Sequence, residues 1–581
     1  MGTCINCKFC TDPENDSLNN SLQISKDFSI IDKFSKINPI YANKDKSLKN
    51  KALLNNINLS SKEKNIFEKK ISSLNKKKKK NKIIIRKVDG VLSTRYNELS
   101  NKDNDKLDIS DNSLSISTRM LINEISQSPE KKYKVLKNIG HGSFGDVFLA
   151  YNIYTKVKVA IKKIFKSNED LLSDGEIMDE IEILKCLNHP DIVKIIEFYG
   201  TEEAYYIVNE FCPWGELYNK ANGQMSETQI SVIFRQILSG LSYLHSKNIV
   251  HRDLKLENIL ISDKEYIEAT KEEYFDVKII DFGNARIFNN NNLNKPIVGS
   301  IYYIAPEVFN KKYNMECDLW SAGVILYMLI TGCPPFDGED NKKIMEKIKI
   351  GIFDKNNINY KNASFEVKDL ISKLLVIEPN KRLTANQALQ HPWLNKTKSN
   401  ILYYNISKDE ILKCIQNILS YNIKSRYEEI VLAYIVHNLP QQKEIKTIIK
   451  LFKIINKKGD GKLDKKELKY GLLNFVSDNY LKNLDEIFNL LDGEKRGYIE
   501  YEEFLRAGLD RKQILTEENL KYAFNFFDKE NNGYITKDRM KIFFVKPIID
   551  EELYNRTFDE IDKNKDGKID YQEFKDMMLY N

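Results

Sequence analysis

The octapeptide "HRDLKLEN" (His251–Asn258) decides how the central part of this 581-residue chain folds. Further motifs flank it in a fixed order: "GHGSFGDV" (Gly140–Val147), "VAIK" ending at Lys162, "DFG" (Asp281–Gly283) and "APE" (Ala305–Glu307). Alone, the glycine-rich motif is a weak signal, because a plain turn between two strands shows the same pattern. The order and spacing of all the motifs together exclude coincidence.

The residues around these motifs predict two kinds of element. "YKVLKNIG" and "KVKVAIKKI" are typical of strands around a glycine turn, and long amphipathic helices follow them. The pattern begins at Tyr133 and ends near "HPWL" (His391–Leu394). We therefore predict one domain over residues 133–394.

By its motifs, this domain resembles a eukaryotic protein kinase. The resemblance implies a bilobal fold, with a small β-rich lobe and a large helical lobe, that transfers the γ-phosphate of ATP to a hydroxyl. "DLKLEN", with Lys255, and "GSIYYIAPE", with Ser300, resemble the serine/threonine kinases rather than the tyrosine kinases.

The resemblance also implies the catalytic residues, Asp253, Lys255 and Asn258. Asp253 would accept or orient the proton of the incoming hydroxyl, and Lys255 would lie beside the transferred phosphate. Asn258 and Asp281 would hold Mg²⁺, because a hard cation prefers oxygen ligands.

The same resemblance implies a nucleotide site. Glycines at positions 140, 142 and 145 would let the backbone approach the phosphates, since they carry no Cβ. Lys162, paired with Glu180, would bind the α- and β-phosphates, and Glu216 would contact ribose or a substrate arginine. The full set expected to bind the cofactor is Ile139, Gly140, His141, Gly142, Ser143, Phe144, Gly145, Asp146, Val147, Lys162, Glu180, Glu210, Cys212 and Glu216.

One part of the kinase resemblance is unusual. The segment "NARIFNNNNLNKPIV" (Asn284–Val298) contains no Ser, Thr or Tyr. Many kinases order this segment by phosphorylating it, so that the phosphate pairs with the arginine equivalent to Arg252. We therefore expect activation to come from elsewhere in the chain. Glu307 is expected to brace the large lobe through an ion pair with Arg382.

The C-terminal part repeats a pattern that is typical of calcium loops. Such a loop supplies oxygen ligands from positions 1, 3, 5, 7, 9 and 12, with glycine at position 6. The stretch 562–573, "DKNKDGKIDYQE", fits throughout. Its expected ligands are Asp562, Asn564, Asp566, the Lys568 carbonyl, Asp570 and Glu573.

Three earlier loops of this kind, at 456–467, 492–503 and 528–539, depart from the pattern. The first has Lys458 at position 3, the second has Arg496 at position 5, and the third ends in Arg539. A cation among cation ligands opposes binding electrostatically. We expect weak sites in the first two loops, with the ligands Asn456, Asp460, Asp464, Glu467, Asp492, Glu494, Glu500 and Glu503.

A kinase domain followed by four EF-hands resembles the calcium-dependent protein kinases of plants and alveolate protists. The implied fold class is multidomain α+β: a bilobal kinase, then an all-α calmodulin-like domain at 442–581. The family implies that the connector 395–441 blocks the kinase until calcium-loaded EF-hands withdraw it. We expect Lys408 or Lys413 to contact the substrate cleft, although a simple packing helix is the alternative.

The first 130 residues have a different composition. They are dominated by Asn, Lys, Ser and Asp, which favours disorder with short helices at most. Gly2 and Cys4 resemble myristoylation and palmitoylation sites, although Asn6 replaces the usual Ser or Thr. The lysine run Lys76–Lys80 is either a solvated stretch or a second membrane contact. A metal site formed by Cys4, Cys7 and Cys10 would lack a fourth ligand.

The overall composition limits the remaining function classes. No apolar stretch of about 18 residues predicts a membrane span, and the start lacks a secretory signal. The 8 cysteines are not spaced as a disulfide framework. We expect a monomer, either free in the cytoplasm or attached to a membrane by acylation. It is expected to use ATP, Mg²⁺ and Ca²⁺ and to bind protein substrates but no nucleic acid. Two other functions stay open: a constitutively active kinase with structural EF-hands, and a calcium-sensing scaffold without catalysis.

Overall fold

The computed structural model describes most of the chain from residue 115 onward. The described ranges are 115–116, 121–142, 145–166, 174–288, 299–311, 313–396, 407–422, 425–438, 443–493, 495–542, 544–545 and 551–579. Gly2, Cys4 and the lysine run Lys76–Lys80 lie outside these ranges, as do Ser143, Phe144 and Glu494. No helix within the described ranges is long and apolar enough to cross a membrane.

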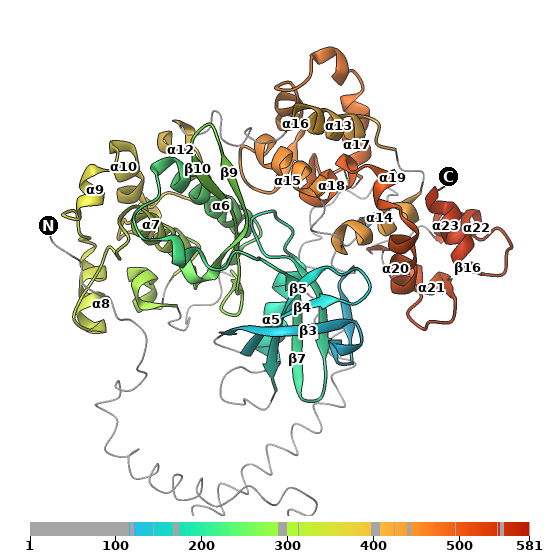
Figure 1. Cartoon of the computed structure of the whole chain (residues 1–581), viewed down its shortest axis with the longest axis horizontal. Helices are drawn as coiled ribbons and strands as arrows, with labels where there is room; N and C mark the ends of the chain where they lie inside the picture. Colours follow the sequence, from blue (N-terminus) through green and yellow to red (C-terminus); the bar gives the residue numbers. More distant parts are fainter. Residues whose placement is uncertain are drawn as a thin grey trace, which may run out of the picture. The chain divides into compact units, whose positions relative to one another are not determined.

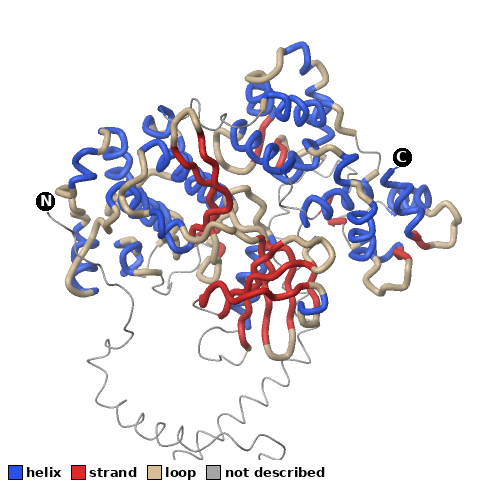
Figure 2. The backbone as a smooth tube through the Cα atoms, in the orientation of Figure 1, coloured by secondary structure: helices blue, strands red, loops and turns tan. Residues whose placement is uncertain are grey.

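The small lobe contains a six-stranded sheet, ordered β2-β6-β7-β5-β4-β3, with helix α5 beside it (Figures 1 and 2). Neighbouring strands from β3 to β6 are antiparallel. The elements are β2 (Asn123–Ile125), β3 (Tyr133–Gly142), β4 (Gly145–Asn152), β5 (Lys158–Phe165), α5 (Asp174–Lys185), β6 (Ile195–Gly200) and β7 (Ala204–Glu210).

The segment before the kinase motifs is more structured near its end than its composition indicated. Strand β2 adds to the sheet as an edge strand, parallel to β6. A second short strand, β1 (Ser115–Ile116), pairs with β15 (Phe544–Val545). Pairing with a preformed edge supplies hydrogen bonds that a short polar segment cannot make within itself, so composition alone does not reveal such strands.

The large lobe is mainly helical and encloses the largest hydrophobic core of the described residues. Helices α6 and α7 lie at its centre, and each buries most of its side chains. Its elements are α6 (Glu227–Ser246), β8 (Ile249–Val250), β9 (Ile259–Ile267), β10 (Glu272–Ile279), β11 (Arg286–Ile287), α7 (Glu316–Thr331), α8 (Asn341–Ile350), α9 (Ile358–Asn362), α10 (Phe365–Leu374), α11 (Ala385–Leu389) and α12 (Pro392–Lys396).

The rest of the chain forms helix–loop–helix units. Short strands join their loops in pairs: β12 with β13, and β14 with β16. The elements are α13 (Lys408–Leu419), α14 (Arg426–Asn438), α15 (Lys443–Ile455), β12 (Lys462–Asp464), α16 (Lys465–Leu472), α17 (Leu484–Leu491), β13 (Tyr498–Glu500), α18 (Tyr501–Gly508), α19 (Arg511–Ile514), α20 (Glu517–Phe527), β14 (Tyr534–Thr536), α21 (Lys537–Lys541), α22 (Glu551–Ile561), β16 (Lys568–Asp570) and α23 (Tyr571–Leu579).

The connector helices α13 and α14 belong to the core of this C-terminal region. The apolar face of α13, with Ile411, Ile415 and Ile418, is buried in the same cluster as the EF-hand helices. The Lys413 ammonium lies 3.1 Å from the Asp510 carboxylate. The prediction that Lys408 or Lys413 contacts the substrate cleft is therefore wrong for Lys413 in this arrangement, because the apolar face of α13 packs against the EF-hand helices. For Lys408 it stays a prediction.

Candidate active site and cation-binding loops

Lys162 forms the centre of the nucleotide-binding part of the cleft. It projects from β5, and its Nζ lies 2.8 Å from Glu180 Oε1 on α5 and 3.1 Å from Asp281 Oδ1. The sequence motifs expected the first pair, and the structure brings all three residues together. An ammonium held between two carboxylates is fixed in direction, so it presents a positive charge at one point of the cleft.

Asp281 is held in a backbone conformation that few residues adopt. Its φ is 61°, in the left-handed region, which is uncommon outside glycine and is often found at functional sites. Burial would raise the pKa of its carboxyl, but the neighbouring Lys162 ammonium outweighs this and lowers the pKa. The next residue, Phe282, is buried with its ring 5.1 Å from that of His251. The Asp281 carboxylate is therefore fixed in direction and favoured in its ionised form.

The catalytic residues converge on the Asp253 carboxylate. The Lys255 ammonium lies 3.0 Å from its Oδ2, and the Asn258 side chain donates to its backbone carbonyl over 2.9 Å. The Ser300 backbone N–H points at Oδ1 over 3.3 Å, and the Ser300 hydroxyl lies 3.1 Å from the Lys255 ammonium. Asp253 is buried and ionic contacts fix its direction, so it can orient a hydroxyl at the mouth of the cleft.

Asp318, at the start of α7, binds the backbone of the catalytic loop. The sequence motifs did not predict this role. Its carboxylate accepts from the backbone N–H groups of His251 and Arg252, both over 2.9 Å, and pairs with His245. Burial alone would raise its pKa, but His245 and these donors lower it. The only signal in the sequence was an aspartate in the first turn of an apolar helix. Such a residue is equally well explained by its favourable interaction with the helix dipole.

The glycine-rich motif forms a tight hairpin. His141 pairs with Asp146 across it, with 2.6 Å between Nδ1 and Oδ1. A Cβ on Gly145 would lie 2.0 Å from the Lys163 carbonyl oxygen, so no other residue fits there. A Cβ on Gly140 would meet no atom within 4 Å. This open side is consistent with a backbone that approaches a ligand rather than packing against protein.

Three further residues expected at the nucleotide site, Glu210, Cys212 and Glu216, lie at the end of β7 and directly after it. The Glu210 carboxylate lies 2.9 Å from the Lys278 ammonium and accepts from the Lys194 backbone N–H, so this side chain is structural. Cys212 is buried, which raises its pKa to about 12 and keeps it a neutral thiol. Burial raises the pKa of the Glu216 carboxyl, and repulsion from the nearby Glu257 carboxylate raises it further.

Arg252 is already bound by neutral oxygens. Its Nε donates to the Asn284 carbonyl over 2.5 Å, and Nη1 donates to the Tyr313 hydroxyl over 3.1 Å. In many kinases the equivalent arginine pairs instead with a phosphate on the activation segment. The expected brace is also present: Arg382 Nη1 lies 2.8 Å from Glu307 Oε1, in a buried pair.

In the loop 562–573, two buried carboxylates receive only backbone donors in the described structure. Asp562 accepts from Gly567 N–H over 2.8 Å, and Glu573 accepts from the N–H groups of Lys563 and Asp570, both over 3.0 Å. Among the described residues, no Lys or Arg forms an ion pair with Asp562 or Glu573. Burying anionic oxygens without a cation is costly, so this loop fits a cation.

The expected ligands of the loop 562–573 are not gathered around one point. Within the described ranges, no group of three or more His, Cys, Asp or Glu side chains is gathered closely enough to hold a metal ion. The other expected carboxylates are turned to their own backbone: Asp566 accepts from Lys568 N–H over 2.9 Å, and Asp570 from Glu573 N–H over 2.8 Å. The donor set, which includes Asn564 and the Lys568 carbonyl, is suited to Ca²⁺.

In the loop 456–467, a lysine takes the place expected for calcium. Lys458 Nζ lies 2.5 Å from Asp464 Oδ2 and 3.2 Å from Glu467 Oε2, the carboxylates at positions 9 and 12. Asn456 is buried and uses its side chain on the loop's own backbone, including the Lys462 carbonyl over 3.0 Å. Asp460 accepts from Lys462 N–H. The expected weak site is therefore filled by the protein.

The loop 492–503 follows the same principle with an arginine. The Arg496 guanidinium lies 2.6 Å from Glu503 Oε1, 3.4 Å from Glu500 Oε1 and 3.8 Å from Asp492 Oδ1. Burial raises the pKa of Glu503 to about 7, against the lowering effect of Arg496. These residues do not fit Ca²⁺, because a fixed cation lies among the ligands. Sequence position had indicated weakened binding but not where the side chain lies.

The loop 528–539 differs again. Its last residue, Arg539, donates to the Phe526 carbonyl over 3.3 Å and lies over the Phe526 ring. Asp528 accepts from the backbone N–H groups of Asn532 and Gly533, in the same manner as Asp562. The loop thus keeps its turn but has an arginine where the twelfth-position carboxylate belongs.

Comparisons with known proteins agree with this geometry. Residues 133–394 match the protein kinase domain, and residues 445–507 and 517–579 each match an EF-hand domain pair. The chain is 35% identical over 506 residues to calcium-dependent protein kinase 4 of Plasmodium falciparum, covering 82% of this chain and 94% of that protein. It is also 35% identical over 505 residues to calcium-dependent protein kinase 5 of the same organism, covering 84% of this chain and 86% of that protein.

Proposed function

The chain belongs to the calcium-dependent protein kinase family and is a calcium-regulated serine/threonine protein kinase, and from this premise we propose that the loop Asp562–Glu573 holds the controlling ion. Support comes from its complete set of oxygen donors and from its two buried carboxylates, which no lysine or arginine neutralises within the described residues. The other loops contain a positive side chain at a ligand position.

The active site supplies what phosphoryl transfer requires. Lys162 directs its charge into the cleft where the α- and β-phosphates of ATP would lie, and Glu180 keeps it there. Asp253 would orient the Ser or Thr hydroxyl of the substrate and take up its proton. Lys255, 3.0 Å from Asp253, would neutralise charge on the transferred phosphoryl group.

Asn258 and Asp281 are the residues that would hold Mg²⁺. Both are fixed by contacts within the site, Asn258 to Asp253 and Asp281 to Lys162. Bound Mg²⁺ supplies charge neutralisation for the phosphates. The protein's contribution is to fix the direction of both oxygen-bearing side chains through these contacts.

One observation carries the proposed switch. In the same structure, the Lys162–Glu180 pair is formed and the apolar face of α13 is buried in the EF-hand core. We propose that calcium in the fourth loop favours this arrangement. Without calcium, α13 would leave the EF-hand core and block the kinase. The ordered contacts of Arg252 explain how the site can form without a phosphorylated activation segment.

The test is peptide phosphorylation by the full-length protein, with calcium and with a chelator, beside a chain that ends near residue 400. The proposal expects calcium to raise the rate of the full chain at least tenfold, and expects the truncated chain to be active under both conditions. Equal rates in the full chain would favour the constitutively active alternative. A folded but silent truncated chain would contradict release of a block.

For the N-terminal segment we propose acylation at Gly2 and Cys4, with the lysine run Lys76–Lys80 as an electrostatic second contact. A single acyl chain binds a membrane only marginally, so two signals are needed. We propose a monomer at the cytosolic face of a membrane. Fractionation of a Gly2→Ala variant tests this, since an unchanged distribution between membrane and soluble fractions would exclude the lipid anchor.

A further inference from the structure

The first two EF-hand loops contain their own cations. Lys458 lies between Asp464 and Glu467, and Arg496 lies among Asp492, Glu500 and Glu503. In both loops the contacted carboxylates include the twelfth-position glutamate, which in a calcium loop supplies both of its oxygens to the ion. The ammonium and the guanidinium therefore occupy the place of the metal, and not only a position beside it.

The two filled loops form one structural unit. Strands β12 and β13 pair antiparallel, with Lys462 opposite Glu500 and Asp464 opposite Tyr498. The helices α15 and α18, which flank the two loops, pack Phe452 against Tyr501 and Phe504. Each loop therefore supports the other, and a charge fixed in one helps to set the geometry of both. We call α15–α18 with its loops, residues 443–508, the first EF-hand pair.

Calcium would have to displace these side chains to bind. A divalent ion a few ångströms from a retained ammonium or guanidinium is repelled, more strongly at the partly buried Arg496 than at Lys458, which is about half exposed. Each side chain can leave only by giving up its carboxylate contacts, and its covalent tether to the loop keeps its local concentration high. The loops are thus held in a filled conformation whether or not calcium is present.

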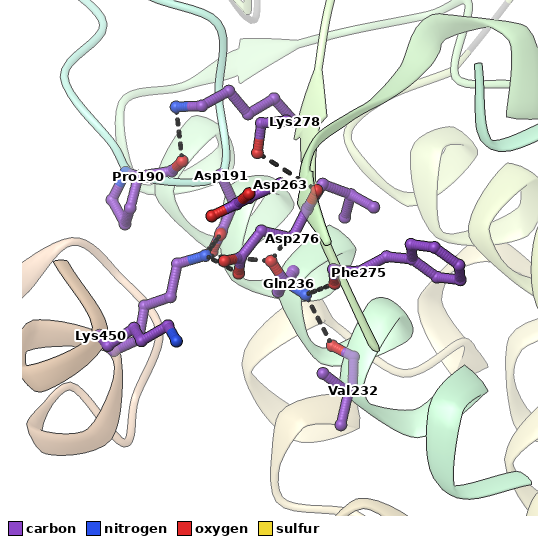
Figure 3. A network of polar contacts seen from close by, with 12 residues as sticks. Pro190, Asp191, Val232, Gln236, Asp263, Phe275, Asp276, Lys278 and Lys450 are labelled. Carbon is purple, nitrogen blue, oxygen red and sulfur yellow. Dashed lines mark hydrogen bonds and ion pairs between the residues drawn. The ribbon is translucent and has the colours of Figure 1, made fainter. Parts of the chain in front are cut away.

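This first EF-hand pair also binds the kinase through a buried cation. Lys453 on α15 reaches Asp191 and Asp276 of the large lobe, with Nζ–carboxylate distances of 2.7 and 2.9 Å. It also donates to Gln236 over 3.0 Å, and Figure 3 shows Asp191, Gln236 and Asp276 converging on one point. The Lys453 ammonium is buried and fully satisfied, which is the condition for a buried ion pair to be stable.

Further contacts surround that anchor on the same side of the kinase. Lys446 and Lys450 pair with Asp263 and Glu265 on β9, over 2.8 and 2.6 Å. Lys194, at the entry to β6, pairs with Glu502 over 3.1 Å. These contacts come from α15 and α18, the helices that the filled loops hold in place.

One filled loop itself contacts the kinase. The Gly459 carbonyl accepts from the Ser239 hydroxyl on α6 over 3.2 Å. A Cβ on Gly461 would lie 2.8 Å from the Tyr243 ring. A loop that opened and closed around calcium would disturb these contacts, because it packs too closely on α6 to change shape independently.

We propose that the first EF-hand pair is a calcium-independent docking module, closed by Lys458 and Arg496, that keeps the C-terminal region attached to the back of the kinase. Calcium sensing is then confined to the second EF-hand pair, residues 517–579. This inference builds on the proposed role of the loop Asp562–Glu573, and its tests separate the two.

The first test counts bound calcium on the full-length protein by native mass spectrometry after equilibration in calcium. In an Asp528→Ala/Glu573→Gln variant both loops of the second pair are disabled and the first pair is untouched. The proposal expects no bound calcium in this variant. One or more tightly bound ions would overturn it. If the variant keeps as many ions as the parent, the proposed role of Glu573 fails as well, so the two failures are distinguishable.

The second test restores ligands to the first pair. A Lys458→Asp/Arg496→Asp variant replaces both internal cations by oxygen donors at positions 3 and 5, and the proposal expects at least one more bound calcium ion than in the parent. The matched control is Lys457→Asp/Lys495→Asp, which makes the same change of charge at positions that do not supply ligands. Equal gain in the control, or no gain in the first variant, would contradict the proposal.

The third test concerns docking. Hydrogen exchange of the full-length protein is measured in α15 and in the β9–β10 hairpin, with calcium and with a chelator. The proposal expects protection there to differ by less than twofold between the two conditions, while α22 and α23 respond strongly. A tenfold loss of protection in α15 on calcium removal would show that docking depends on calcium and would overturn the proposal.

Discussion

The kinase cleft and the first EF-hand loop each hold a lysine between two carboxylates, and they use it in opposite ways. In the kinase cleft, Lys162 contacts Glu180 and Asp281. In the first EF-hand loop, Lys458 contacts Asp464 and Glu467 at similar distances. The kinase cleft is suited to a polyanion, and the fixed positive charge of Lys162 would attract it. An EF-hand loop is suited to a cation, and the fixed positive charge of Lys458 competes with that cation for the carboxylates.

The comparison shows that a local arrangement of charges does not define a function until the ligand is considered. Lys162, on β5, is nearly buried, and its two partners come from different elements: Glu180 from α5 and Asp281 from the segment after β10. Lys458 is about half exposed and pairs within its own loop. The first arrangement links parts of the kinase that must come together, whereas the second closes a loop on itself.

The largest effect is expected from Lys162→Met. Loss of the ammonium leaves Glu180 and Asp281 without their shared partner and removes the charge that faces the phosphates, so kcat should fall by about 10³-fold. Lys163→Met is the control, because Lys163 lies on the same strand but over the Phe165 and Tyr206 rings. Steady-state phosphorylation of a peptide measures both, and a loss below tenfold for Lys162→Met would contradict its assigned role.

The next largest effect is expected from Lys453→Met. The variant leaves Asp191 and Asp276 close together without their cation, and breaking a buried pair in this way costs about 3–5 kcal/mol. Because Lys453 links α15 to the large lobe, the variant should weaken the docking of the C-terminal region on the kinase. The thermal transition of the C-terminal region should then separate from that of the kinase. Lys457→Met serves as the control in calorimetry. A single unchanged transition in the Lys453 variant would show that the contacts of Lys453 with Asp191 and Asp276 do not hold the two regions together.

A smaller effect is expected from Lys458→Ala. Because this lysine is about half exposed, its ion pairs contribute on the order of 1 kcal/mol or less. In chelator, the variant should unfold at slightly lower temperature than the parent, since Asp464 and Glu467 then repel each other. Added calcium should stabilise this variant more than the parent, because only the variant has a first loop without an internal cation in addition to the loop 562–573. Differential scanning with and without calcium measures the shift, and an equal calcium response in the parent would argue that its loop is open.

The smallest effect is expected from Tyr313→Phe. It removes one hydrogen bond from the charged Arg252 guanidinium to a neutral hydroxyl, and it leaves the Asn284 carbonyl contact in place. Activity should fall by less than tenfold, and the calcium dependence should not change. Loss of activity by several orders of magnitude would mean that Tyr313 is the main support of the activation segment.

Much of the kinase site follows from the sequence, because its motifs fix chemistry at defined spacing. Lys162 with Glu180, and Glu307 with Arg382, lie together as the motifs predict. Asp318 was missed, since its contacts are to backbone N–H groups that leave no trace in a pattern of residues. The sheet edge formed by β2 was missed because strand pairing depends on an existing edge rather than on local composition.

The EF-hand region shows where reasoning from position reaches its limit. A lysine at position 3 and an arginine at position 5 predicted weak calcium sites, but position does not tell whether the side chain turns out to solvent or into the loop. Arg496 turns inward, whereas Arg539 turns toward the Phe526 carbonyl. The contacts of Lys453 join residues from α6, β10 and α15 that are far apart in sequence, so no sequence motif predicts them.

The most direct test of the account compares two glutamates at the same loop position. Full-length Glu467→Gln, in the first loop, and Glu573→Gln, in the fourth, are each assayed for peptide phosphorylation over a calcium titration. The account predicts that Glu467→Gln keeps the calcium midpoint of the parent and that Glu573→Gln loses stimulation by calcium. Stimulation lost in Glu467→Gln and kept in Glu573→Gln would contradict the assignment of calcium control to the second EF-hand pair.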